Sequence, residues 1–254
     1  WGEHGGTLVH LARAHAVATS PSVTRNTARA RRWIPALMDK QPVVQTNRRP
    51  VNTVEWVGPT SGEEITRLHR EFVLGQFTAS VPADWRWGFK EIRYGEAEAA
   101  YLETLFPRAR LIYLVRGPAR VLRGQIDALA RGENRRLPAH AARLRQFYAG
   151  VATASSRVEQ RRAVVIRYED AAMDPHRTAS ALSAFLGTRY LPDLVDAIAA
   201  EQVRSGLKLV AAPTGDGVIQ ELEQLAAERG VALERSLMQE LADTYLAACA
   251  LTAR

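Results

Sequence analysis

The sequence predicts an α/β fold, a doubly wound parallel sheet flanked by helices, with a helical C-terminal part over residues 191–254. Three observations predict it. Leu111–Val115 is an apolar, β-branched run that leads directly into a segment with helical periodicity. Strand-like and helix-like segments alternate from Trp85 to Gly187, which is the pattern of βαβ units. Beyond Leu191, apolar residues recur mainly at helical spacing.

The central strand is Leu111–Val115, and its apolar side chains predict a place inside a sheet covered by helices on both faces. The strand ends at Arg116, and a helix follows Pro118. Ligands of open α/β sheets bind outside the carboxyl ends of the strands, where the next helix offers free N–H groups to an anion. Arg116 is therefore the first candidate ligand residue, although an arginine held in a salt bridge at a strand end would give the same pattern.

The segments before this strand predict several helices and two strands, with a short helix at Trp33–Met38 among them. The other helices are expected at Thr7–Ala18, from Ser61 to Val73, and at Glu96–Phe106. An edge strand is expected at Val54–Val57, and the alternation of aromatic and polar residues predicts another at Trp85–Ile92.

The segments after the central strand predict a long helix over Pro138–Arg162 and a short strand over Ala163–Arg167. A helix over Pro175–Leu186 is expected to end at Gly187, a residue typical of helix C-termini. The last helix carries Leu233, Leu237, Leu241 and Leu246 on one side. That apolar side can pack on its own domain or on a second copy, so a homodimer through the C-terminal helix stays possible.

Length and composition indicate one domain over residues 1–254, with no membrane span. The net charge of +7 favours anionic partners, but the arginine clusters lack the interleaved aromatic residues of a nucleic-acid platform. Cys249 is the only cysteine, which excludes an internal disulfide and a thiolate metal cluster and favours a reducing cytoplasm. Because the chain begins at Trp1 without an initiator Met, we expect an N-terminally incomplete fragment.

Three segments together resemble the PAPS-dependent sulfotransferase family, in its glycan-type and bacterial branch, where PAPS is 3′-phosphoadenosine 5′-phosphosulfate. The segments are WGFKEIRYG at Trp87–Gly95, LFPRARLIYLVRGPARVLRGQ at Leu105–Gln125 and VVIRYEDAAMDP at Val164–Pro175. The resemblance implies a fold like that of P-loop NTPases, PAPS as the sulfuryl donor and no metal. The family's phosphosulfate-binding loop is not seen, and if present it would lie upstream of Trp1. The turn at Val57–Gly62 superficially resembles such a loop but reads as an ordinary helix N-cap.

The resemblance also implies roles for single residues. Arg116 matches the arginine that holds the 3′-phosphate, a task that suits the parallel donors of a guanidinium. The family usually has a serine eight residues later for the same phosphate, where this chain has Gly124, so Arg123 or Gln125 is the candidate replacement donor. Lys90 matches the lysine near the transferring group, although its spacing fits a solvated lysine equally well.

Glu3 lies in a short segment that resembles the family's source of the catalytic base, and His4 beside it is the rival base. An ordinary exposed N-terminal glutamate would look the same. The Tyr168–Asp170 segment resembles a strand-end acidic motif, for which we expect a structural role.

The sequence thus predicts a cytoplasmic enzyme of bacterial type that transfers a sulfuryl group from PAPS to a hydroxyl or amine of a carbohydrate, lipid or small metabolite. The alternative is a catalytically inactive relative that binds a nucleotide or a protein partner at the same sheet edge. A third hypothesis, nucleic-acid binding by the basic surface, requires association with a steep salt dependence; we expect no nucleic-acid partner.

Overall fold

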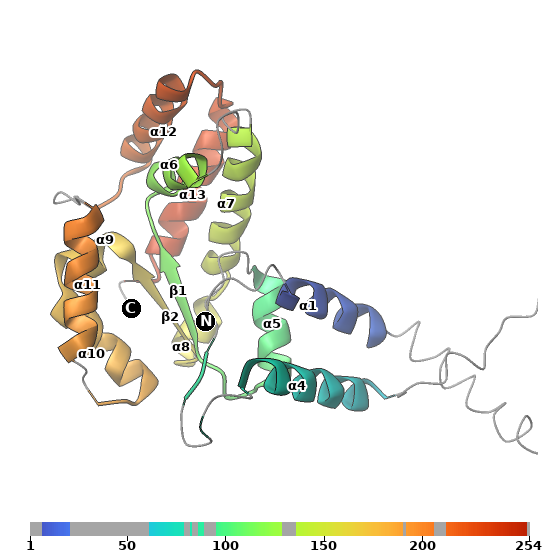
Figure 1. Ribbon diagram of the computed structural model, residues 1–254. Helices are drawn as coiled ribbons and strands as arrows, with labels where there is room; N and C mark the ends of the chain where they lie inside the picture. The colour runs from blue at the N-terminus through green and yellow to red at the C-terminus, as the bar shows by residue number, and fades with distance from the viewer. Residues whose placement is uncertain are drawn as a thin grey trace, which may run out of the picture. The chain divides into compact units, whose positions relative to one another are not determined.

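The computed structural model describes residues 7–20, 61–78, 82, 86–88, 95–128, 136–189, 192–205 and 212–252. The chain divides into two compact units, residues 1–107 and residues 108–254. Figure 1 labels the helices and strands of both. None of the helices in these ranges is long and apolar enough to cross a membrane. The expectation of one domain over the whole chain stays a prediction.

The first unit contains three described helices: α1 (Thr7–Ala18), α4 (Gly62–Thr78) and α5 (Glu96–Leu105). The prediction for α1 is confirmed to the residue, and α4 extends five residues beyond the predicted Val73. Seven buried side chains form the core of this unit: Leu8, Ala12, Val73, Phe77, Tyr101, Leu102 and Leu105. This unit is held together by helix packing in its described part.

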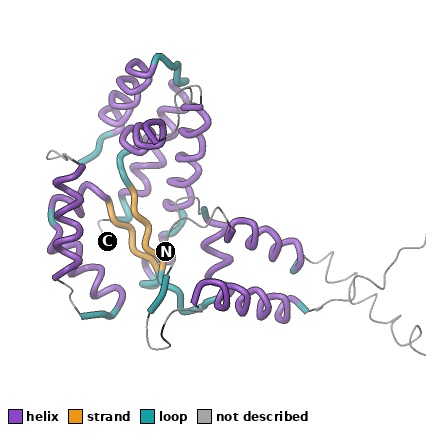
Figure 2. The backbone as a smooth tube through the Cα atoms, in the orientation of Figure 1, coloured by secondary structure: helices purple, strands orange, loops and turns teal. Residues whose placement is uncertain are grey.

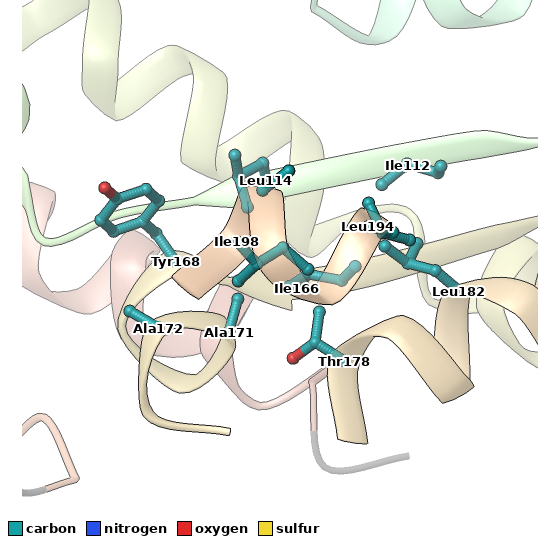
Figure 3. A pocket seen from close by; sticks show the side chains of 11 residues that line it. Ile112, Leu114, Ile166, Tyr168, Ala171, Ala172, Thr178, Leu182, Leu194 and Ile198 are labelled. Carbon is teal, nitrogen blue, oxygen red and sulfur yellow. The ribbon is translucent and has the colours of Figure 1, made fainter. Parts of the chain in front are cut away.

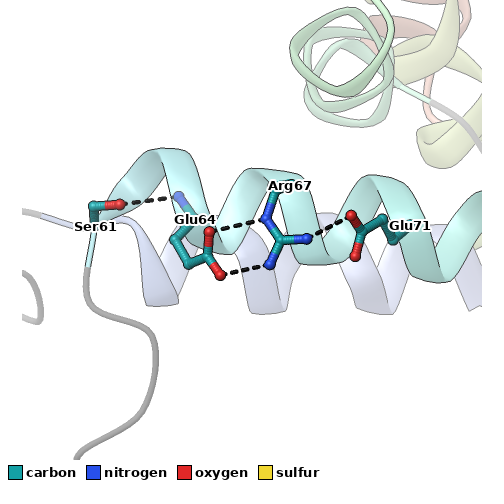
Figure 4. Close-up of polar contacts among 4 residues, drawn as sticks. All are labelled: Ser61, Glu64, Arg67 and Glu71. Atoms are coloured by element: carbon teal, nitrogen blue, oxygen red, sulfur yellow. Dashed lines mark hydrogen bonds and ion pairs between the residues drawn. The ribbon is translucent and has the colours of Figure 1, made fainter.

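The start of α4 confirms that the Ser61 turn is a helix N-cap. The Glu64 N–H donates to the Ser61 hydroxyl at 3.0 Å, and Arg67 pairs with Glu64 and Glu71 along the exposed side of the helix (Figure 4). Of the predicted strand Trp85–Ile92, only residues 86–88 are described, and they are irregular. The predicted strand Val54–Val57 and the predicted short helix Trp33–Met38 lie outside the described residues.

The second unit is built on two parallel strands, β1 (Leu111–Val115) and β2 (Ala163–Arg167), both with the predicted bounds. Their register pairs Leu111 with Ala163 and Val115 with Arg167, so the two strands end at the same level. Helices lie on both sides of the strands, as Figure 2 shows. The described sheet has these two strands, and the wider doubly wound sheet stays a prediction.

On one face of the strands, α13 (Arg235–Cys249) contacts both β1 and β2. The helices α6 (Pro118–Ala128), α7 (Leu137–Ala152) and α12 (Gly215–Arg229) share the core on that face. The main core of the unit lies there and includes Val115, Leu122, Leu137, Tyr148, Val165, Leu222, Leu241 and Tyr245. The terminal helix α13 packs against α7, so its apolar side is used within its own unit. Dimerisation through this helix stays a prediction.

The other face of the strands is covered by α9 (Tyr168–Met173), α10 (Pro175–Leu186) and α11 (Pro192–Ser205). The predicted end of α10 is confirmed, because Gly187 adopts the left-handed conformation with φ of 62°. Here the expectation that β1 is buried on both faces is wrong. Ile112 and Leu114 are 45% and 54% exposed, since this helical layer leaves a cavity over them.

The predicted long helix over Pro138–Arg162 is also wrong. The structure has α7 ending at Ala152 and a separate short helix, α8 (Ser155–Glu159). The Thr153 hydroxyl donates to the Gly150 carbonyl at 2.7 Å, a local bond that competes with helix continuation. Ala154 is fully buried at the break, and the turn lets the chain return to β2.

Candidate functional site

The candidate site lies at the carboxyl ends of β1 and β2. Because Val115 pairs with Arg167, the next residues of the two strands, Arg116 and Tyr168, are neighbours. The guanidinium carbon of Arg116 lies 4.4 Å from the centroid of the Tyr168 ring, which is a close cation–π contact. The sequence predicted the place of Arg116 at this edge, but it did not indicate that Tyr168 supports the guanidinium.

The Arg116 side chain has a donor, its Nε, that can still form a hydrogen bond. Its Nε is buried and has no hydrogen-bond partner among the described residues. A buried guanidinium donor without a partner is costly, so the position favours an anionic ligand that accepts from it. The neighbouring Arg167 differs, because its Nε donates to Asp170 Oδ1 at 2.9 Å.

Both polar groups of the peptide unit between Arg116 and Gly117 are held by buried side chains. The Tyr148 hydroxyl, from α7, donates to the Arg116 carbonyl. The Gly117 N–H donates to Glu169 Oε1, from α9, at 2.9 Å, and Glu169 is 3% exposed. The backbone that carries Arg116 is therefore fixed from two sides.

This arrangement limits which N–H groups near the start of α6 an anion could use. The Gly117 N–H, just before the helix, is already bonded to Glu169 and is not free for an anion. Pro118, the next residue, has no N–H to offer. The Arg116 side chain is thus a better anion donor at this edge than the start of the helix.

Two buried tyrosine hydroxyls and one partly buried thiol belong to the core next to the site. Burial raises the pKa of Tyr148 well above its usual value, and the negative charge of Glu169 acts in the same direction. Burial likewise raises the pKa of Tyr245, and it raises that of Cys249 to about 11. These groups are neutral at physiological pH, which keeps Tyr148 a hydrogen-bond donor to Arg116.

An apolar cavity of about 310 Å³ lies beside Tyr168, between the strands and α9–α11. Ile112, Leu114 and Ile166 line it from the sheet. Figure 3 shows Tyr168 at one end and Leu182 and Leu194 at the other. The Tyr168 ring thus contributes to the cavity and also contacts Arg116. An anion bound at Arg116 would have apolar surface next to it.

The other predicted site residues are placed as follows. Arg123 pairs with Glu228 of α12 at 2.9 Å, on the exposed side of α6. Gly124 is exposed, and apart from its chain neighbours and the backbone of its own helix no atom lies within 4 Å of where its Cβ would be. The Oε1 atom of Gln125 is buried without a hydrogen-bond partner in the described part of the chain. Glu3, His4 and Lys90 lie outside the described residues.

Among the described residues, no group of three or more His, Cys, Asp or Glu side chains is placed to hold a metal ion. Comparisons with curated proteins and with solved structures give no match. A family model described as the sulfotransferase family matches residues 5–193, a span that contains both strands and the candidate site. The chain therefore belongs to the sulfotransferase family.

Proposed function

We propose that the protein is a PAPS-dependent sulfotransferase and that Arg116 holds the 3′-phosphate of the donor. The observation that carries the proposal is the Arg116 guanidinium, supported by Tyr168 at the end of a parallel strand, with a buried Nε that has no partner among the described residues. A phosphate supplies the acceptors that this side chain lacks. The apolar surface beside Tyr168 is suited to a less polar part of the same nucleotide.

The donor, when bound, supplies an activated sulfuryl group. The chain's own residues would orient the reactants and manage charge, because sulfuryl transfer resembles phosphoryl transfer in its dependence on positioning and positive charge. Lys90 would counter the negative charge that develops at the transferring group. Glu3, or His4 in its place, would take the proton from the acceptor hydroxyl or amine. These three roles rest on the family resemblance.

The acceptor class that we propose is a hydroxyl or amine of a carbohydrate, lipid or small metabolite. The proposed location is the bacterial cytoplasm, consistent with the single cysteine of the chain.

The proposal is tested by isothermal titration of the full chain with 3′-phosphoadenosine 5′-phosphate (PAP), the desulfated donor, and with AMP, which lacks the 3′-phosphate. We expect PAP to bind more tightly than AMP, and Arg116→Ala to remove that difference. The matched control is Arg235→Ala, which removes an arginine from an exposed ion pair with Glu223. Equal binding of PAP and AMP, or unchanged PAP binding by Arg116→Ala, overturns the proposal.

The second candidate is a catalytically inactive family member that binds a nucleotide or a protein partner at the same edge. Gly124, where the family usually has a serine, favours it. Incubation with ³⁵S-labelled PAPS and a panel of sugar, lipid and phenolic acceptors distinguishes the two candidate functions. Transfer of label to an acceptor excludes a catalytically inactive protein.

A further inference from the structure

The peptide unit between Arg116 and Gly117 is held at both of its polar groups by side chains that come from different helices. Its carbonyl accepts from the Tyr148 hydroxyl of α7, and its N–H donates to the Glu169 carboxylate of α9. These partners are 32 and 52 residues away along the chain. The orientation of this peptide unit fixes the backbone at Arg116 and therefore the direction in which its side chain leaves the chain. It thus influences where the guanidinium lies.

Core packing alone does not explain why residue 148 is a tyrosine and not a phenylalanine. The Tyr148 side chain is fully buried, and its ring packs against the rings of Phe147 and Tyr245, at centroid distances of 5.5 Å and 5.2 Å. A phenylalanine would make the same ring contacts without burying a hydroxyl, a burial that is costly unless the group is hydrogen-bonded. The bond to the Arg116 carbonyl provides that compensation.

We infer that Tyr148, together with Glu169, is a positioning residue for anion binding by Arg116. This inference rests on the proposed function, since it assigns Tyr148 to the site that would hold the 3′-phosphate. Tyr148 acts through the backbone of Arg116, so its loss weakens recognition of the 3′-phosphate and spares the rest of the nucleotide.

The test is Tyr148→Phe in the full chain, with PAP and AMP titrated separately. We expect PAP affinity to fall about five- to tenfold, as for loss of one hydrogen bond that orients a charged group, and AMP affinity to stay unchanged. The matched control is Tyr245→Phe, which removes a buried hydroxyl that interacts with Cys249 rather than with Arg116. It should leave the ratio of PAP to AMP affinity at the wild-type value.

A purely structural role for Tyr148 would lower the melting temperature and leave that ratio unchanged, and this result overturns the inference. An equal fall of the PAP-to-AMP affinity ratio in Tyr245→Phe also overturns the inference.

Amide hydrogen exchange gives a readout that needs no ligand: in Tyr148→Phe we expect faster exchange at Gly117, with the buried core amide of Ala179 unaffected. If wild-type protein does not distinguish PAP from AMP, the proposed function itself fails. If wild-type protein distinguishes them and Tyr148→Phe does so equally well, only the positioning role fails.

Discussion

The guanidinium of Arg116 lies 4.4 Å from the centroid of the Tyr168 ring, across the carboxyl ends of two parallel strands. The contact links the residue proposed to bind the 3′-phosphate to the wall of the apolar cavity. Tyr168 therefore supports the Arg116 cation. This role differs from that of the acidic residues Glu169 and Asp170 that follow it.

Replacement of Tyr168 by leucine should weaken PAP binding about two- to thirtyfold, since a cation–π contact of this kind is worth about 0.5–2 kcal/mol. Tyr168→Phe keeps the ring and should retain most of the affinity. Titration calorimetry on both variants measures the effect. Equal losses in the leucine and phenylalanine variants would show that the hydroxyl, and not the ring, supports Arg116.

Replacement of Glu169 by alanine should lower the free energy of unfolding by about 1–3 kcal/mol, because the buried Gly117 N–H loses its acceptor. Glu169→Gln keeps an oxygen acceptor in the same place and should cost less. Urea unfolding followed by circular dichroism measures both. Asp174→Ala is a useful comparison, as it removes a carboxylate that accepts from an exposed N-terminal N–H of α10. A smaller loss for Glu169→Ala than for Asp174→Ala would contradict the structural role.

The strands could be predicted because each is a short apolar run bounded by polar residues, and β1 and β2 begin and end at the predicted residues. The end of α10 was also predictable, because Gly187 requires no special tertiary context to adopt a positive φ. By contrast, α9 is six residues long, too short for a helical period to emerge from Tyr168–Met173. The break after Ala152 depends on a local Thr153 bond that periodicity does not reveal.

The candidate site was predictable only in part. Arg116 stands where an apolar strand stops, and that position has a functional meaning in α/β sheets. Tyr148 gave no such signal, because a tyrosine on the apolar side of a helix is ordinary core, and its hydroxyl bond spans 32 residues. The cation–π contact of Tyr168 follows from the strand register, which only the folded chain provides.

A pair of neighbouring histidines, His15 buried and His69 partly buried, predicts acid sensitivity of the first unit. The His15 and His69 rings lie 5.1 Å apart between centroids. His15 Nε2 bonds with the Thr66 hydroxyl, and His69 Nδ1 with the Tyr101 hydroxyl, both at 2.9 Å. Burial, and then the charge of His69, lowers the pKa of His15, and burial lowers that of His69. Both rings therefore favour the neutral form in the folded chain.

Since both pKa values lie below the ordinary value of 6.5, the unfolded chain takes up protons more readily than the folded one. Stability should therefore be constant above about pH 7 and fall as the pH drops below 6.5. Urea unfolding at pH 7.5 and pH 5.5 measures the loss, which His15→Gln should reduce. His10→Gln changes an exposed histidine of the same helix and should leave the loss unchanged. An equal pH dependence in His15→Gln and wild type would contradict the prediction.

The Cys249 thiol should be slow to react in the folded protein. Burial raises its pKa from 9.0 to about 11, so the thiolate fraction at pH 8 falls about 100-fold. Reaction with Ellman's reagent at pH 8 measures this rate, with the same protein in guanidinium chloride as the reference. Because Cys249 is the only cysteine, the denatured chain should release one equivalent of thiolate reporter. A comparable rate in the native protein would contradict the burial of the thiol.

Gly124 offers a gain-of-affinity test of the donor site. It lies inside α6 and is exposed, and no atom beyond its chain neighbours and its own helix backbone lies within 4 Å of where its Cβ would be, so a side chain can be added without a clash. Gly124→Ser and Gly124→Ala should both stabilise the helix, by about 0.5 and 1 kcal/mol, because an interior glycine is a poor helix former. Only the serine supplies the hydroxyl that the family usually places eight residues after the phosphate-binding arginine.

PAP affinity should therefore rise about three- to tenfold in Gly124→Ser and stay at the wild-type value in Gly124→Ala. Calorimetry with PAP and AMP separates the two effects, since greater helix stability alone would not change the preference for a 3′-phosphate. If serine and alanine have the same effect on the ratio of PAP to AMP affinity, residue 124 does not face the phosphate that Arg116 is proposed to hold. The assignment of Arg116 would then depend on the Arg116→Ala variant alone.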